Sequence, residues 1–145
     1  MASQTRNVFL DSSVLIAAAI SARGSARDLF YRGLYGDIRL IISPLVLRES
    51  ERNIRTKVPH VLDAFATLAE VLTDRVTPTQ TAMEQAAEMI ELKDAAIVAA
   101  AVAARAEYLA TYDRKHLLAK KAEIGEAFGI IVATPDEILV ALHAA

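Results

Sequence analysis

Short apolar runs alternate along this sequence with longer segments whose apolar residues recur at helical spacing. A short apolar run bounded by turn-forming residues is typical of a strand buried on both faces. Such runs predict four strands, and Arg75-Val76 predicts a short edge strand in addition. The four runs are Val8-Phe9-Leu10, Arg39-Leu40-Ile41-Ile42, Tyr108-Leu109-Ala110-Thr111 and Ile130-Ile131-Val132.

Helix-start signals lie between these runs. Ser43-Pro44 combines an N-cap residue with proline at the first helical position. Three further segments are typical of a capping box: residues 25–28, 77–80 (with Gln80 reaching back) and 134–137. We therefore expect helices over about residues 12–22, 25–34, 44–57, 59–72, 80–91 and 94–105, and from 135 onward.

Strands separated by helices require crossover connections, which place helices on both faces of a parallel sheet. The pattern therefore predicts an α/β fold, a three-layer α/β/α sandwich with a mostly parallel central sheet. A length of 145 residues, 54% of them hydrophobic, fits a single domain spanning residues 1–145.

Composition narrows the classes of function. The chain has no cysteine, which excludes disulfide scaffolds and cysteine-based zinc sites. The longest apolar run, Ala95 to Ala104, is too short to span a bilayer, and Asp11-Ser12-Ser13 interrupts the stretch that would form a signal peptide. We expect a cytoplasmic protein without a membrane anchor. A net charge of −2 argues against binding nucleic acid by broad electrostatics alone.

Four acidic residues stand out because of where the predicted elements place them. Asp11 and Asp113 follow strands, at the sheet edge where ligands bind in parallel α/β folds. Asp94 heads the most apolar helix, and Glu49 lies about two turns into the helix after residues 39–42. Each also has a structural interpretation: Asp11 and Asp94 as helix caps, Asp113 as a turn residue, and Glu49 as a solvated side chain.

Taken together, the acids favour a metal site. Carboxylates gathered at buried strand ends repel one another unless a cation or a proton neutralises them. A site built only from carboxylates suits Mg²⁺ or Mn²⁺. Such a cation keeps water ligands, one of which can become a nucleophile, and it screens phosphate charge. The sequence therefore points to hydrolysis of phosphodiester bonds.

The four acids lie in four sequence blocks that occur in a set order. The blocks are Val8-Phe9-Leu10-Asp11-Ser12-Ser13-Val14-Leu15-Ile16-Ala17, Ser43-Pro44-Leu45-Val46-Leu47-Arg48-Glu49-Ser50-Glu51-Arg52, Leu92-Lys93-Asp94-Ala95-Ala96-Ile97-Val98-Ala99-Ala100-Ala101 and Tyr108-Leu109-Ala110-Thr111-Tyr112-Asp113. In this order they resemble the motifs of PIN domains, a family of metal-dependent ribonucleases. The resemblance covers about residues 7–136.

The resemblance implies an acidic catalytic site that holds Mg²⁺ or Mn²⁺. Its members would be Asp11, Glu49, Asp94 and Asp113, with Ser13 and Thr111 as supporting hydroxyls. Glu49 rather than Glu51 matches the family's glutamate. Some members carry a further acid after the fourth one; here Arg114, Lys115 and His116 follow instead, which leaves one or two metals open.

The family also suggests partners. Many members cleave RNA as toxins inhibited by a small antitoxin protein, others process RNA, and homodimers are common. The apolar segment Ile138–Leu142 suits either a dimer interface or packing on its own sheet, and we favour the latter.

Basic residues near the acids offer contacts to RNA. Arg48 and Arg52 share one face of the helix that carries Glu49, and Arg114 and Lys115 follow Asp113. These four could bind phosphates, or they could simply be solvated. The three histidines, at positions 60, 116 and 143, show no ligand spacing. His116 is close enough to Asp113 in the sequence to approach the site, but we do not expect it to be catalytic.

Three other protein classes are alternatives to this interpretation. A receiver-type domain requires adjacent acids after its first strand, and a haloacid-dehalogenase-type phosphatase requires Asp-x-Asp, where this chain has Ser13. The remaining alternative is a catalytically weak or inactive PIN-fold module that binds RNA or a protein partner.

Overall fold

The central feature of the fold is a sheet of five parallel strands in the order β3-β2-β1-β4-β5. The computed structural model describes residues 6–144. The predicted α/β architecture with a mostly parallel sheet is confirmed, because every strand pair is parallel. The strands are β1 (Arg6–Leu10), β2 (Ile38–Ile42), β3 (Asp74–Arg75), β4 (Tyr108–Ala110) and β5 (Ile131–Ala133).

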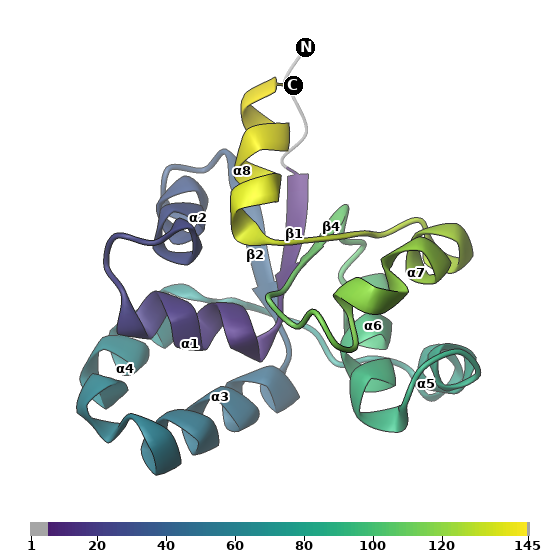
Figure 1. Ribbon diagram of the computed structural model, residues 1–145, viewed down its shortest axis with the longest axis horizontal. Coiled ribbons are helices and arrows are strands. Elements are labelled where there is room, and N and C mark those ends of the chain that lie inside the picture. The colour runs from purple at the N-terminus through teal and green to yellow at the C-terminus, as the bar shows by residue number, and fades with distance from the viewer. Residues whose placement is uncertain (1–5, 145) are drawn as a thin grey trace.

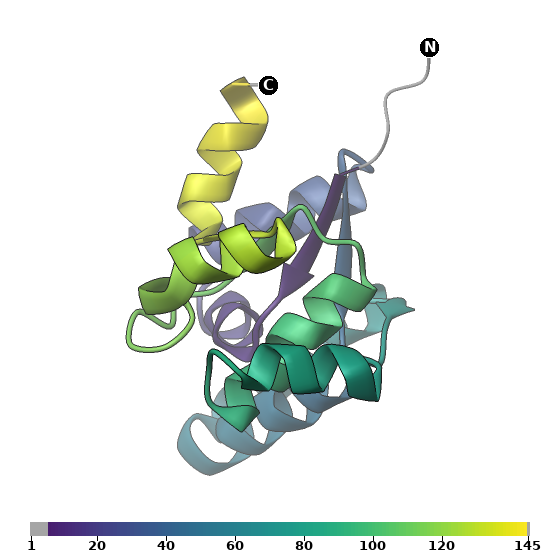
Figure 2. The same cartoon turned by 90° about the vertical axis from the view of Figure 1, so that its right-hand side faces the viewer.

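Helices cover both faces of the sheet (Figure 1). Helices α1 to α4 lie on one side with α8 beside α2, whereas α5, α6 and α7 lie on the other side, which faces the viewer in Figure 2. The helices are α1 (Ser12–Ile20), α2 (Ser25–Leu34), α3 (Pro44–Lys57), α4 (Leu62–Val71), α5 (Gln80–Ala87), α6 (Leu92–Ala103), α7 (Lys121–Phe128) and α8 (Pro135–Ala144), with short 3₁₀ turns η1 (Pro59–Val61) and η2 (Leu118–Lys120).

Chain direction explains this division. The chain steps from β1 to β2 to β3 toward one edge and then returns across β1 to β4. Crossovers between parallel strands keep one hand, so a reversal of direction moves the connecting helices to the opposite face. The strand order reverses between β1 and β4, and the carboxyl ends of these two strands therefore open onto the crevice where such folds bind ligands.

Two of the predicted helix starts are confirmed. Ser43 accepts a hydrogen bond from the amide of Val46 at 3.2 Å, with proline at the first helical position of α3. The amide of Thr134 donates to the Glu137 carboxylate at 2.9 Å, and the amide of Glu137 donates back to the Thr134 hydroxyl at 3.4 Å. Both caps orient helices that follow buried strands.

Two capping predictions were wrong. Thr79 caps α5 by accepting from the amide of Ala82, and the amide group of Gln80 donates to Glu84 instead of reaching back. Ser25 lies inside α2, and its hydroxyl forms a 2.8 Å hydrogen bond with the Tyr112 hydroxyl. In both places a tertiary or neighbouring helical partner competes with the local cap.

Element boundaries also differ from the sequence expectation. Helix α7 was not predicted; it is short and ends at Phe128, with Gly129 at its C-cap and a φ of 71° there. Helix α5 ends at Ala87, and the predicted helix 59–72 divides into η1 and α4. Helix α6 begins at Leu92 rather than at Asp94, so Asp94 lies within its first turn.

Alanine is the reason that α6 lies deep in the molecule. Five of its residues between Ala95 and Ala101 are alanines that are 9% exposed or less, and Val98 is fully buried. Small side chains let the helix backbone approach the sheet closely. The buried helix carries Asp94, at its amino end, away from bulk solvent. No helix within residues 6–144 is long and apolar enough to cross a membrane.

Candidate active site

The four predicted acids line one cavity of about 340 Å³, which we call the acidic cavity. Asp11, Glu49, Asp94 and Asp113 reach it from the end of β1, from α3, from α6 and from the segment after β4. These segments are far apart in the sequence and meet at the carboxyl edge of the sheet. The structure therefore brings together all four of the residues that the sequence singled out.

Asp11 is held in place by two hydroxyl groups. Strand register pairs Leu10 with Ala110, which sets Asp11 beside Thr111. The hydroxyls of Ser13 and Thr111 each donate to Oδ2 of Asp11 at 2.8 Å. Each hydroxyl also accepts a backbone amide, from Tyr112 or from Asp113, which fixes the hydroxyl protons on Asp11. Oδ1 of Asp11 has no hydrogen-bond donor within the described chain.

Asp94 is a buried carboxylate without a partner. Its side chain is 6% exposed and makes no hydrogen bond or ion pair with residues 6–144. Because no polar side-chain atom of these residues is both sealed from solvent and unpaired, its oxygens must face the cavity. Burial raises the pKa of Asp94, as do the charges of Asp113 and Asp11, whereas His116 and Lys93 oppose the rise.

Glu49 occupies the cavity wall, and Glu51 does not. Glu49 is partly buried, and this burial raises the pKa of its carboxyl group. The positive charge of Lys93 opposes the rise, whereas the negative charge of Asp11 adds to it. Glu51 is exposed on the same helix and pairs with Arg55 at 3.4 Å. The geometry thus favours Glu49 over Glu51 as the glutamate of the site.

Asp113 has both a structural and a cavity-facing role. Its Oδ1 accepts the backbone amides of Lys115 at 3.2 Å and His116 at 3.1 Å, the pattern of a side chain that fixes a turn. Its Oδ2 lies 3.2 Å from Nδ1 of His116. The turn interpretation from the sequence was therefore correct in part, and the same carboxylate still lines the acidic cavity.

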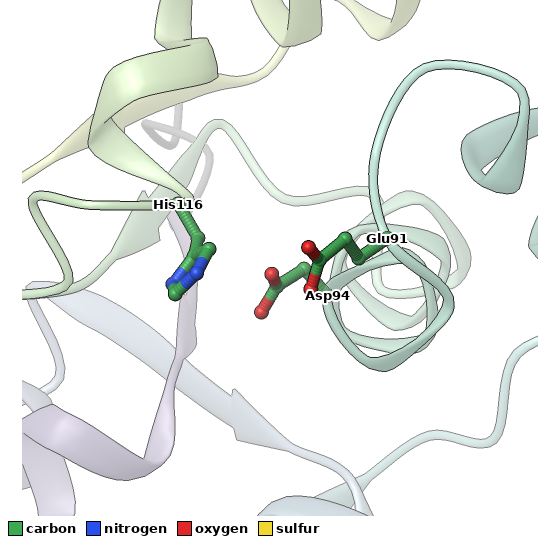
Figure 3. A group of neighbouring side chains, drawn as sticks. All are labelled: Glu91, Asp94 and His116. Carbon is green, nitrogen blue, oxygen red and sulfur yellow. The ribbon is translucent and has the colours of Figure 1, made fainter.

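Three ionisable residues of the cavity wall were not among the predicted site residues: Glu91, Lys93 and His116. Glu91 is the N-cap residue of α6 and precedes Asp94 by three positions. This signal was hidden because the helix was expected to begin at Asp94. Figure 3 shows His116 on the opposite wall, directed toward the carboxylates of Glu91 and Asp94.

Basic residues lie on both sides of the acids. An adjoining cavity of about 420 Å³ shares Glu49 and Lys93 with the acidic cavity and is lined further by Arg52 and Lys57. A smaller cavity of about 130 Å³ shares Asp94 with it, and Lys115 and Lys120 line this one. We call these three adjoining cavities, which share lining residues, the groove. Of the four predicted RNA contacts, Arg52 and Lys115 line the groove; Arg48 and Arg114 are exposed outside it.

The donor set fits a divalent cation of the hard class. Oδ1 of Asp11 and the carboxylate of Asp94 face the acidic cavity without a protein donor, and burial leaves Asp94 short of solvation. Carboxylate oxygens are the ligands that Mg²⁺ and Mn²⁺ prefer. Asp11 and Asp94 would hold such an ion, with Glu49 and Asp113 close enough to assist directly or through water.

Comparisons with known proteins agree with this fold. The structure resembles the crystal structure of PAE2754 from Pyrobaculum aerophilum, with a TM-score of 0.68, 19% identity, and coverage of 99% of this chain and 100% of that one. It also resembles the Mycobacterium tuberculosis toxin VapC20, described as cleaving the sarcin–ricin loop, with a TM-score of 0.54, 18% identity, and coverage of 77% and 94%. A search among curated proteins gives no match. Members of the PIN-domain family are generally nucleases. The sequence model of this family matches residues 7–115, so this chain belongs to the PIN-domain family.

Proposed function

We propose that the protein is an endoribonuclease that depends on Mg²⁺ or Mn²⁺. The observation that carries the proposal is the convergence of four carboxylates in one cavity, with Asp94 buried and unpaired. A purely structural protein gains nothing from a buried unpaired carboxylate, because ionising it there costs free energy. Binding a cation during function offsets that cost.

Each acid has a distinct part in this proposal. A bound divalent cation would neutralise phosphate charge and favour ionisation of an attacking water. Asp11, oriented by Ser13 and Thr111, and Asp94, held rigidly by α6, would fix the position of that charge. Glu49, whose pKa is raised by burial, suits the acceptance of a proton at its carboxylate.

The groove supports a polyanionic chain as the substrate. Arg52, Lys57 and Lys93 lie on one side of the acids, and Lys115 and Lys120 lie on the other. Phosphate contacts of this kind position a nucleic acid without reading its sequence. A groove that continues on both sides of the acids suits cleavage within a chain rather than removal of terminal nucleotides.

Cleavage of a circular RNA tests this proposal directly. The wild-type protein should linearise it with Mg²⁺ or Mn²⁺ and lose that activity with chelator. Glu49→Gln should cleave far more slowly, whereas the matched variant Glu51→Gln, exposed on the same helix, should match wild type. RNA binding without cleavage under all of these conditions would favour the inactive binding module instead.

We also propose a role as a toxin restrained by a small antitoxin protein. The support is the shared fold with VapC20, itself described as a toxin that cleaves the sarcin–ricin loop. Expression of the protein alone should slow host growth, and Asp94→Asn should be tolerated. Harmless expression of an enzyme that cleaves RNA in vitro would favour RNA processing. A homodimer stays a prediction; in α8, Ile138 and Leu142 pack into the protein's own core.

A further inference from the structure

We propose that Glu91, Asp94 and His116 form a second cation position with a nitrogen ligand, selective for a transition metal such as Mn²⁺ over Mg²⁺. One ligand atom from each residue lies within 4.8 Å of the other two. Glu91 and Asp94 come from the start of α6, and His116 comes from the segment after β4 (Figure 3). The inference rests on the proposed nuclease site because Asp94 belongs to both.

The spacing of the three side chains needs little adjustment. Ligand atoms bound about 2.1 Å from one metal ion lie up to roughly 4.2 Å apart. The three ligand atoms lie within 4.8 Å of one another, a bound slightly wider than this limit. Glu91 and His116 are both exposed, so small rotations of their side chains can close the difference without repacking the core.

The environment of Asp94 on the side of Glu91 and His116 gives a second reason to expect an ion here. It is 94% buried, with a relative exposure of 6%, and its carboxylate points between Glu91 and His116 without a hydrogen-bond partner in the described chain. The carboxylate of Glu91 lies close by, and although Lys115 and Lys120 line the same small cavity, neither forms an ion pair with Glu91 or Asp94 within the described residues. Two neighbouring carboxylates, one of them buried and unpaired, are stabilised by a positive charge between them.

His116 is oriented as a metal ligand would be. Nδ1 lies 3.2 Å from Oδ2 of Asp113, and since a carboxylate only accepts, Nδ1 must donate the proton. When the ring carries only this proton, its lone pair is on Nε2 and can bind a metal. Metal-binding histidines usually donate their other ring proton to a carboxylate in this way. Asp113 thus acts as a positioning residue for His116.

The nitrogen ligand sets the choice of metal. Imidazole suits Mn²⁺ poorly compared with later transition metals but much better than it suits Mg²⁺, which prefers oxygen and retains its water. Because this position combines two carboxylates with one imidazole, we expect it to take Mn²⁺, Co²⁺ or Zn²⁺. The cation position around Asp11 offers only oxygen ligands and should therefore bind Mg²⁺ as well as it binds Mn²⁺.

Electron spin-echo spectroscopy of bound Mn²⁺ tests the site, because it detects a directly coordinated nitrogen. The protein must lack a histidine tag. Wild type should show ¹⁴N coupling that excess Mg²⁺ does not remove, and His116→Gln should lose it. The matched control His60→Gln changes an exposed histidine of η1 and should keep the coupling. Circular dichroism establishes that all three proteins are folded.

Asp113→Asn examines the positioning role. The ¹⁴N coupling should persist at saturating Mn²⁺, while the Kd of the nitrogen-bound ion rises by about 10- to 100-fold. An unchanged Kd would show that Asp113 does not orient the ring.

The remaining outcomes separate this inference from the proposed function. Bound Mn²⁺ without ¹⁴N coupling, absence of Mn²⁺ binding, or coupling that survives in His116→Gln each overturns the site. Metal-dependent RNA cleavage by the same protein would leave the proposed function standing in those cases. Conversely, nitrogen-bound Mn²⁺ in a protein that cleaves no RNA would support the site and overturn the nuclease proposal.

Discussion

The acidic residues at the two ends of the central sheet differ in their ion pairs with arginine. At the amino end, Arg6 binds Glu107 through two hydrogen bonds of 2.7 and 2.5 Å, and Arg39 binds Asp74 through two of 3.0 Å. At the carboxyl end, the acids of the acidic cavity have hydroxyl, amide or histidine neighbours but no arginine ion pair. Arginine side chains of the chain itself thus supply the counter-charge at the amino end but not at the carboxyl end.

The pKa directions express this difference. Hydrogen bonds from arginine lower the pKa of Glu107 and of Asp74. Burial raises the pKa of Glu49 and of Asp94. Glu107 and Asp74 therefore stabilise the fold in their ionised form, whereas ionised Glu49 and Asp94 destabilise it. A cluster of carboxyl groups whose pKa is raised by burial is typical of a functional site.

The largest contrast should appear in catalysis. Asp11→Asn keeps the size of the side chain and removes its charge, so RNA cleavage should fall by orders of magnitude. Asp74→Asn removes an acid of the same type at the amino end and should leave cleavage unchanged. Initial rates on one labelled RNA, with melting curves as a check on folding, make the comparison. Full activity of Asp11→Asn, once contaminating nuclease is excluded, would falsify the site assignment.

The sheet and the four acids were predictable because their signals are local. Val8-Phe9-Leu10 must be buried, and an acid directly after such a strand must lie at its carboxyl end. Asp113 follows Tyr108–Ala110 for the same reason. Once the strand–helix alternation fixes a parallel sheet, these ends meet at one edge.

The remaining features depend on contacts that the sequence does not encode locally. Glu91 and His116 approach each other across more than twenty residues, and His116 is oriented by Asp113 only once the turn has formed. Helix α7 has little periodicity, since Ile124 alone is buried within it. The partner of Arg6 lies 101 residues away. Such pairings follow from strand register, which no single segment specifies.

The second contrast concerns metal and stability. If Asp94 belongs to a cation site, Mn²⁺ should stabilise the wild-type fold by about 2.7 kcal/mol at a hundredfold excess over Kd. That corresponds to several degrees in Tm for a domain of this size. Asp94→Asn should be at least as stable as wild type without metal and should respond less to Mn²⁺. Asp74→Asn should keep the full response. Melting curves with chelator and with Mn²⁺ decide; equal shifts for wild type and Asp94→Asn would remove Asp94 from the site.

The third contrast is the sign of the pH dependence without metal. The folded pKa of Asp94 lies above its ordinary value of 3.8, so ionised Asp94 destabilises the fold above that folded pKa, and the penalty fades as pH falls to the ordinary value. Asp94→Asn should therefore gain stability at neutral pH and lose this advantage in acid. Glu107 has a folded pKa below 4.5 and contributes stability above its ordinary value that is lost as pH falls through the folded pKa.

Glu107→Gln should accordingly be less stable than wild type at neutral pH, with a deficit that shrinks in acid. Urea unfolding of the three chelated proteins, from neutral pH to below the ordinary carboxyl pKa, measures both curves. Differences of the same sign for Asp94→Asn and Glu107→Gln would contradict the division of the sheet into two ends.

The smallest effect should come from the arginine pair itself. Arg6 and Glu107 have side chains that are 30% and 37% exposed, and partly exposed ion pairs contribute only about 0.2–1 kcal/mol. The two-point geometry and the ring of Tyr108, 5.6 Å below the Arg6 guanidinium, favour the upper part of that range. A double-mutant cycle with Arg6→Gln and Glu107→Gln, read from urea unfolding at neutral pH, isolates the coupling. It should shrink in high salt because exposed pairs are screened. All three variants should cleave RNA at the wild-type rate, because this pair lies at the end of the sheet opposite the acids. A coupling free energy near zero would mean that the ion pair of Arg6 and Glu107 does not stabilise the amino end of the sheet.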